Sequence, residues 1–345
     1  MDYKELMDNA ELIAANYDDK QILDMSKDLP FDERMNFSYK IECIRNKTSY
    51  QESFAGLMHR EKFTEMLVDN DELDYIIGNI DKVIYLSAHL KDVPLDYLKK
   101  NIDRITPEQM SHIEDAITHA TSIFYPNVRE GSMEKLKKIL YDTAKETGGT
   151  ILDIRNWKYG CYSKTFRINS RVVKVGHGRD IKELPQSNRI LYPYFKGNVG
   201  ADYVEVNDYI ENVRKVDPDR GITEEDFEDI YEIYKDVRDE GLIWVDAWAD
   251  NFGTVTPEQL AASEKRKTDL TDKGIIPNPG YVGGPAKNKL IIDLDFIVFE
   301  DDEYNYNKLK DNMDVCKQMV LENLERRYQE EKAKEKQEGH SPLAK

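Results

Sequence analysis

Residues Gly241 to Gly253 read Gly-Leu-Ile-Trp-Val-Asp-Ala-Trp-Ala-Asp-Asn-Phe-Gly, and residues Lys289 to Phe299 read Lys-Leu-Ile-Ile-Asp-Leu-Asp-Phe-Ile-Val-Phe. In the first stretch, Asp246 is followed five residues later by Asn251. In the second, Asp293 stands at the end of an apolar run with the character of a β-strand. An Asp, an Asn five residues on and a later Asp on a strand form the pattern around which we interpret the remainder of the chain.

The segment before this pattern predicts a small sheet. Short runs rich in β-branched and aromatic residues lie at 166–168 and 171–175, with a tight turn predicted at Asn169–Ser170. A helical or irregular piece is expected at 181–194, and a further β-like run covers 203–206.

The segment around and after the pattern predicts helices and one long insert. A capping box at 223–226 predicts a helix that runs to about Arg238. The insert at about 256–287 ends in a Pro- and Gly-rich run, which predicts either a substrate lid or a disordered loop. One last helix is expected at about 308–332, and the charged residues from Gln329 predict a solvated tail that is frayed or disordered.

Residues 1 to about 145 predict successive helices, because apolar residues recur at three- and four-residue spacing. Thr106-Pro-Glu-Gln109 has the form of a helix start. The run at 73–83 resembles the run at 95–105, and we interpret the two as similar amphipathic helices, since two copies are too few for a solenoid. The clearest apolar series are Leu6, Ala10, Ile13 and Ala14, then Phe63, Met66 and Leu67, then Ile113, Ala116, Ile117 and Ala120.

From about residue 150 to 300, the order of these elements resembles the protein-kinase-like fold, which also includes aminoglycoside and choline phosphotransferases. The resemblance implies a minimal, atypical kinase of bacterial or phage type, and the Asp-x-Asp form at 293–295 is nearer to the small-molecule phosphotransferases. The implied fold class is α+β. A helical domain at 1–145 would precede a two-lobed kinase-like domain at 146–330, with an antiparallel sheet in its N-lobe and helices in its C-lobe, and a charged tail at 331–345.

The resemblance implies that ATP binds along the sheet. Gly160 and Ser163 match the glycine-rich loop whose backbone amides approach the phosphates, although Gly160 alone is left of the usual three glycines. Lys174, on the strand at 171–175, matches the lysine that contacts the phosphates. The alternative for Lys174 is an edge-strand lysine that faces solvent.

The remaining nucleotide-binding residues have weaker signals. The carboxylate partner of Lys174 is Glu183 in our interpretation, and Glu205 is a competing candidate. Residues around Asp208 and Ile210 match the hinge that lines the adenine pocket.

For the opening pattern, the resemblance implies a catalytic residue and a magnesium site. Asp246 would orient or deprotonate the acceptor hydroxyl, while Asn251 and Asp293 would hold Mg²⁺ on the nucleotide. Asp295 is a second ligand candidate, because residues two apart on a strand face the same side.

The loop also departs from the family. Trp244 and Val245 stand where the family has His and Arg, so regulation through a phosphorylated activation segment is not expected. Trp248 replaces the phosphate-stabilising Lys or His two residues after Asp246.

Composition excludes several other classes of protein. The formal net charge of −18 argues against nucleic-acid binding and against a membrane-surface role, since both partners are anionic. No apolar run is long enough to span a bilayer, and the charged N-terminus does not predict a signal peptide. The three cysteines are scattered, which predicts a reduced cytoplasmic setting without a disulfide framework.

The sequence therefore predicts an ATP- and Mg²⁺-dependent phosphotransferase that acts on a hydroxyl acceptor, with a protein favoured over a small molecule. The helical region at 1–145 contains no residue that predicts chemistry and is interpreted as a partner-binding or regulatory module. Two alternatives stay open. The chain is a pseudokinase that serves as a binding or scaffold protein, or it transfers another group such as a nucleotidyl group.

Overall fold

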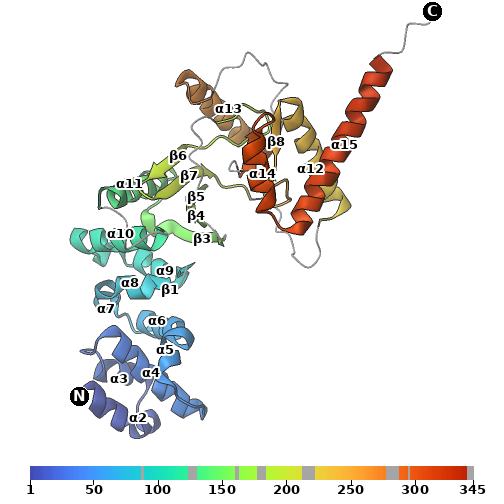
Figure 1. Ribbon diagram of the computed structural model, residues 1–345. Coiled ribbons are helices and arrows are strands. Elements are labelled where there is room, and N and C mark those ends of the chain that lie inside the picture. Colours follow the sequence, from blue (N-terminus) through green and yellow to red (C-terminus); the bar gives the residue numbers. More distant parts are fainter. Residues whose placement is uncertain are drawn as a thin grey trace, which may run out of the picture. The chain divides into compact units, whose positions relative to one another are not determined.

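The computed structural model describes residues 1–86, 89–122, 130–159, 163–176, 184–211, 222–276, 287–293 and 296–339 (Figure 1). The protein is α+β, with a mostly helical N-terminal region, a five-stranded antiparallel sheet and further helices. The chain divides into two compact units. The first comprises Met1–His177 and Asn198–Val204, and the second comprises Gly178–Gly197 and Glu205–Lys345. None of the described helices is long and apolar enough to cross a membrane.

The N-terminal region is helical, as predicted, except for one pair of two-residue strands. The predicted apolar series form the buried faces of these helices, apart from Ala14 and Met66, which are half-buried. The elements are α1 (Tyr3–Asp8), α2 (Ala10–Asn16), α3 (Asp19–Met25), α4 (Phe31–Asn46), α5 (Ala55–Met58), α6 (Arg60–Asp69), α7 (Leu73–Gly78), α8 (Ile80–Ile84), β1 (Tyr85–Leu86), β2 (His89–Leu90), α9 (Asp92–Lys100), α10 (Pro107–Thr121) and α11 (Glu130–Glu146).

The two similar runs at 73–83 and 95–105 share the way in which their helices end. Helices α7 and α9 stop at Asn79 and Asn101, and each Asn Nδ2 donates to a backbone carbonyl oxygen four residues earlier at 3.0 Å. A second short helical piece follows each Asn, namely α8 and the 3₁₀ turn Ile102–Arg104. Each of the two runs is therefore a helix that ends at an Asn and is followed by a second short helical piece. This agrees with the interpretation of two similar helices.

A buried arginine joins three of the first helices. Arg34, on α4, is fully buried. Its Nη2 donates to the carbonyl oxygen of Leu23 at 2.9 Å and to Glu72 Oε1 at 2.8 Å. The guanidinium also lies 4.2 Å from the centroid of the Tyr75 ring. A single side chain thus connects the end of α3, α4 and the start of α7.

The predicted helix start at Thr106 is confirmed. Thr106 Oγ1 accepts from the amide of Gln109 at 3.2 Å, and Gln109 Oε1 accepts from the amide of Thr106 at 2.9 Å. These two bonds satisfy amides at the beginning of α10 that have no partner within the helix.

We expect Thr106→Ala to lower the free energy of unfolding by about 1 kcal/mol, the usual effect of removing an N-cap side chain. Thr106→Ser keeps a hydroxyl group at the same position and serves as the matched control. Urea unfolding of both variants measures the difference. Equal stability of the Ala and Ser variants would show that the cap contributes nothing.

The five-stranded sheet follows α11 and has the strand order β3-β4-β5-β7-β6. The predicted hairpin is confirmed, since β4 and β5 pair antiparallel and Asn169 in the turn has a φ of 52°. Sequence patterns did not indicate β6, because its Gly and Asn are poor strand formers. The strands are β3 (Ile154–Tyr159), β4 (Ser163–Ile168), β5 (Arg171–Gly176), β6 (Phe195–Val199) and β7 (Asp202–Asp208).

The second unit continues with helices and two small strand pairs around a buried apolar cluster. The predicted helix from Thr223 is confirmed, with its capping box formed by Thr223 and Asp226. The elements are α12 (Glu224–Asp239), β8 (Leu242–Trp244), β9 (Phe252–Thr254), α13 (Pro257–Asp272), β10 (Lys289–Ile291), β11 (Ile297–Phe299), α14 (Glu303–Asp311) and α15 (Val315–Gly339).

Two predictions for this part are wrong and one is wrong only in part. The insert at 256–287 begins with helix α13, which Thr256 caps, while the Pro- and Gly-rich run at 277–286 lies outside the described residues, so that its role as a lid or a disordered loop stays a prediction. The single last helix expected at 308–332 is two helices, because Asp314 starts α15 by accepting from the amide of Lys317 at 3.0 Å. The charged residues from Gln329 continue α15 to Gly339, since Glu, Lys, Arg and Ala favour helix formation.

Candidate functional site

Two strand pairs bring the opening pattern of the sequence together. β8 pairs antiparallel with β11, and β9 pairs antiparallel with β10. One segment is the loop at 245–251, which joins β8 to β9, and the other consists of Ile292, Asp293 and Phe296, the described residues between β10 and β11. The amide of Val245 donates to the carbonyl oxygen of Phe296 at 2.8 Å, and the amide of Ile292 donates to the carbonyl oxygen of Asn251 at 2.9 Å. The two segments therefore lie side by side within the second unit.

Asp246 is the centre of a hydrogen-bonded group. Its side chain is buried, and its Oδ2 accepts from Asn251 Nδ2 at 2.9 Å. Asn251 Nδ2 also donates to the Asp246 backbone carbonyl at 3.0 Å. Lys317 Nζ lies 2.7 Å from Asp246 Oδ1 and 3.0 Å from Oδ2. These contacts hold the carboxylate in one orientation.

Burial raises the pKa of Asp246 above its ordinary value. The Lys317 ammonium opposes this shift, while the carboxylate of Asp293 adds to it. The Asp293 carboxylate is therefore close enough to Asp246 for its charge to act on the Asp246 pKa.

The donor set suits a sparsely ligated magnesium ion. Because Asn251 uses its amide nitrogen on Asp246, its amide oxygen is the end that can bind a metal. Asp293 follows Ile292, whose amide is bonded to Asn251, so the two predicted ligands lie on adjoining segments. Across the described residues there is no group of three His, Cys, Asp or Glu side chains around one point. Mg²⁺ accepts such a small protein set, since it keeps waters and uses phosphate oxygens as further ligands.

Two predicted phosphate-binding residues lie on the sheet in the first unit. Lys174 is central in β5 and is opposite Thr165 in the register, and Ser163 begins β4 opposite Gly176. Val173 and Val175 are fully buried, so Lys174 is on the other face of the strand. Gly160, Glu183 and Asp295 lie outside the described residues, and their predicted roles stay predictions.

The residues predicted around the adenine pocket belong to a packed part of the second unit. Asp208 accepts from Tyr194 Oη at 3.0 Å and from Arg266 Nη2 of α13 at 2.8 Å. Ile210 is buried in a small apolar cluster. Glu205, the competing partner for Lys174, forms a buried ion pair with Lys196, with Nζ and Oε2 2.9 Å apart.

The residues that differ from the kinase-like pattern, at positions 244, 245 and 248, are buried or half-buried in the second unit. Trp244 is fully buried and its ring meets that of Phe252 edge-on, with centroids 6.3 Å apart. Val245 is also fully buried. Trp248 is half-buried, and Lys317 Nζ lies 5.7 Å from its ring centroid.

Lys317 is the residue of this group that the sequence interpretation missed. It lies in the first turn of α15, distant in sequence from the loop that it contacts. Asp314 marks the helix start, but no local pattern indicates that the helix reaches Asp246.

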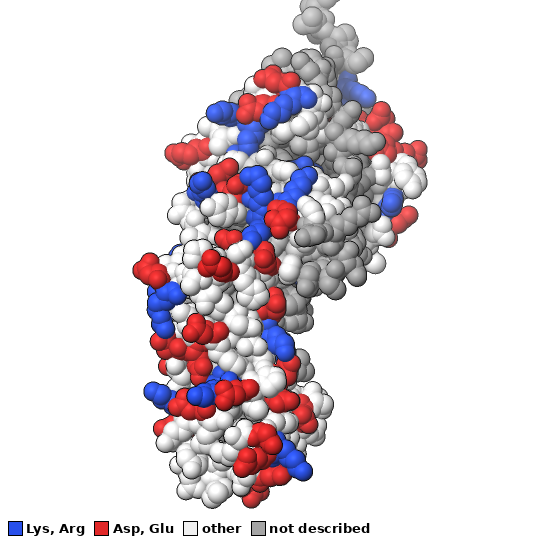
Figure 2. All heavy atoms as spheres, turned by 90° about the vertical axis from the view of Figure 1, so that its left-hand side faces the viewer, with Lys and Arg blue, Asp and Glu red and all other residues white. Residues whose placement is uncertain are grey.

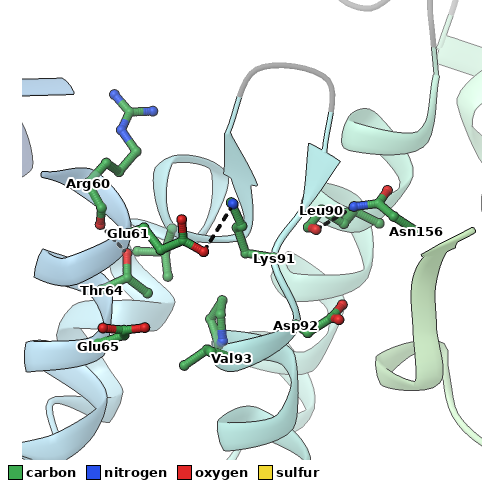
Figure 3. Close-up of a pocket in the computed structure, with 11 residues that line it drawn as sticks. Arg60, Glu61, Thr64, Glu65, Leu90, Lys91, Asp92, Val93 and Asn156 are labelled. Carbon is green, nitrogen blue, oxygen red and sulfur yellow. Dashed lines mark hydrogen bonds and ion pairs between the residues drawn. The ribbon is translucent and has the colours of Figure 1, made fainter. Parts of the chain in front are cut away.

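A pocket of about 360 Å³ lies elsewhere, in the first unit (Figure 3). Its walls come from α6, from the end of β2 and the start of α9, from Val83 of α8 and from Asn156 of β3. Glu61 and Lys91 form an ion pair there, with Oε1 and Nζ 3.1 Å apart. Two further charged side chains of the pocket contact residues outside it, Arg60 with Asp32 and Asp92 with Arg155. Because the pocket contains none of the predicted site residues, we do not assign it to the predicted site.

A second polar group in the first unit is structural. Ser38 Oγ lies 3.0 Å from His59 Nε2, and Glu42 contacts the other ring nitrogen at 2.5 Å. This order resembles a nucleophile, a base and an orienting carboxylate. However, Ser38 is buried in the middle of α4, where the amides are bonded within the helix and cannot serve as oxyanion donors.

Acidic and basic side chains are interspersed on the face shown in Figure 2. Among the residues that are coloured on that face, no large area carries a single charge. Its mixed charges also fit the many surface ion pairs of the N-terminal helices, such as Lys82 with Asp32 and Arg45 with Asp19.

Comparison with known proteins gives one distant likeness to report. No family model and no solved structure matches the chain. The chain is 29% identical to the uncharacterized protein MJ0447 of Methanocaldococcus jannaschii over 119 residues, which are 33% of this chain and 70% of that protein. Because that protein is uncharacterized, the likeness carries no function.

Proposed function

We propose that the chain is an ATP- and Mg²⁺-dependent phosphotransferase with a minimal, two-lobed protein-kinase-like fold. The observation that best supports this proposal is the grouping of Asp246, Asn251 and Asp293 by the pairs β8–β11 and β9–β10. A carboxylate beside an amide and a second carboxylate is the set that phosphotransfer requires for the acceptor hydroxyl and the nucleotide-bound metal.

The proposed reaction transfers the γ-phosphoryl group of ATP to a hydroxyl group. The hydroxyl oxygen forms a bond to the γ-phosphorus, and the bond from that phosphorus to the β,γ-bridging oxygen breaks, so that ADP leaves. Asp246 orients the hydroxyl group and takes its proton. Asn251 and Asp293 would hold Mg²⁺, which when bound neutralises phosphate charge. Ser163 and Lys174 belong to the first unit, and their predicted phosphate contacts stay predictions.

A protein is the acceptor that we propose. The helices α1 to α11 carry none of the residues of the proposed reaction, and α1 to α4 enclose an apolar core of their own, which suits partner binding. A small-molecule acceptor is the alternative.

Labelled ATP tests the proposal. We expect wild-type protein with Mg²⁺ to transfer label from the γ-phosphate to itself, to an acceptor or to water, and to gain thermal stability with ATP only when Mg²⁺ is present. Asp293→Ala is expected to lower transfer by about 10²–10³-fold, the range for losing a group that stabilises charge in the transition state. Asp301→Ala removes an exposed carboxylate of the same unit and is expected to have no effect.

The other outcomes identify the alternatives. Label transferred from the α-phosphate would indicate nucleotidyl transfer. Mg²⁺-dependent binding without any transfer, in the presence of candidate acceptors, would indicate a scaffold protein. Neither binding nor transfer would contradict the proposal.

A further inference from the structure

Lys317 supplies a cation at Asp246 from a separate element of the chain. Asp314 accepts from the Lys317 amide and so fixes the first turn of α15. From there the side chain reaches both carboxylate oxygens of Asp246, at 2.7 and 3.0 Å. The Lys317 side chain is 26% exposed and that of Asp246 is 9% exposed, so the pair is shielded from water but open on one side.

The ion pair is not what holds α15 in place. Helix α15 packs on α12 through the buried residues Leu321 and Leu324. Tyr234 Oη donates to Glu325 Oε2 at 2.6 Å, and Tyr328 Oη donates to Asp239 Oδ1 at 2.9 Å. These contacts lie further along the helix and do not involve Lys317. The position of Lys317 at Asp246 therefore calls for a reason other than helix docking.

The proposed reaction creates a need for a cation at this point. The transferring phosphoryl group is negatively charged and must pass close to the carboxylate of Asp246, which would repel it. The loop itself offers Trp248 where the resembling family has a cationic side chain. Lys317 Nζ lies 5.7 Å from the Trp248 ring centroid, so its ammonium is in the same neighbourhood.

We infer that Lys317 is a catalytic residue of the proposed reaction, one that replaces the missing loop cation from the C-terminal helix. This inference rests on the proposed function. An ammonium group has three N–H donors; Asp246 Oδ2 accepts from one of them, and Oδ1 lies 2.7 Å from Nζ as an ion-pair contact. A further N–H donates to an oxygen of the γ-phosphoryl group as it moves from ADP to the acceptor. Lys317 keeps its protons throughout, and the hydroxyl proton goes to Asp246.

Three variants test the inference. Lys317→Met keeps the length of the side chain and removes the charge, Lys317→Arg keeps the charge, and Lys310→Met removes a lysine of α14 that pairs with Glu322 instead. We expect Lys317→Met to lower kcat by about 10²–10³-fold with little change in the KM for Mg-ATP. The Arg variant is expected to recover at least a tenth of the wild-type kcat, and Lys310→Met is expected to match wild type.

The result that would overturn the inference is a Lys317→Met variant with wild-type kcat. An increase in kcat would overturn it as well, since it would make the contact inhibitory. If Lys317→Met fails to fold, the Arg variant decides. Wild-type-like stability with kcat partly restored supports the inference, and a fully inactive Arg variant that folds normally overturns it. If wild type itself transfers no phosphate, the proposed function fails, whereas a loss confined to the Lys317 variants concerns this residue alone.

Discussion

Asp246→Asn is expected to lower the rate of phosphoryl transfer by about 10²–10⁴-fold, the range for losing a general base. The amide has nearly the same shape as the carboxylate, but it cannot take the proton of the acceptor hydroxyl. Since Asp246 is not a predicted metal ligand, the affinity for Mg-ATP should change much less than the rate. Single-turnover transfer and equilibrium binding of Mg-ATP, measured on the same preparation, separate these two effects.

Asp250→Asn is the matched control, because Asp250 is another carboxylate of the same loop. We expect it to retain most of the activity. A large loss in Asp250→Asn together with an active Asp246→Asn would assign the base to Asp250. Full activity in both variants would mean that neither carboxylate acts as a base, and the proposed role of the loop would then be wrong.

Arg34→Met is expected to lower the free energy of unfolding of the helical N-terminal region by about 3 kcal/mol. The substitution keeps an unbranched side chain in the core. It leaves the Leu23 carbonyl and the Glu72 carboxylate without their shared donor and removes the contact with the Tyr75 ring. Urea unfolding followed by circular dichroism measures the change.

Arg45→Met is the matched control on the same helix. Arg45 pairs with Asp19 at 2.6 Å and also donates to the carbonyl oxygens of Ala14 and Tyr17, but its side chain is 34% exposed and that of Asp19 is 55% exposed, so we expect a smaller loss, of about 1 kcal/mol. Equal losses in the two variants would show that the burial of Arg34 is not what makes its contacts important.

The parts of the fold that could be predicted from the sequence are those whose signals come from neighbouring residues. The hairpin of β4 and β5 follows from two β-like runs around Asn169, a residue that tolerates a positive φ. The starts of α10 and α12 follow from capping boxes, which need only four adjacent residues. The grouping of Asp246 with Asn251 is also local, since one loop carries both residues.

The parts that could not be predicted depend on distant contacts or on competing signals. Helix α13 begins with Thr256-Pro-Glu-Gln259, the same four residues as the start of α10, but the Pro- and Gly-rich run at its other end favoured a loop. The C-terminal part of α15 resembles a solvated tail, although its ion pairs with α12, such as Lys235 with Glu331, favour the helix. The contact of Lys317 with Asp246 joins residues too far apart in sequence for any local pattern to indicate it.

The insert at 256–287 starts after β9 and ends before β10, and these two strands pair with each other. Next to β9 and β10, the amide of Val255 donates to the carbonyl oxygen of Asn288 at 2.8 Å, which closes the base of the segment between them. Residues can therefore be gained or lost inside this segment without changing the register that places Asn251 beside Ile292. In a search for related chains, the number of residues from Asn251 to Asp293 is then a poor criterion. The short interval from Asp246 to Asn251, and the runs that form the two strand pairs, are the features to align.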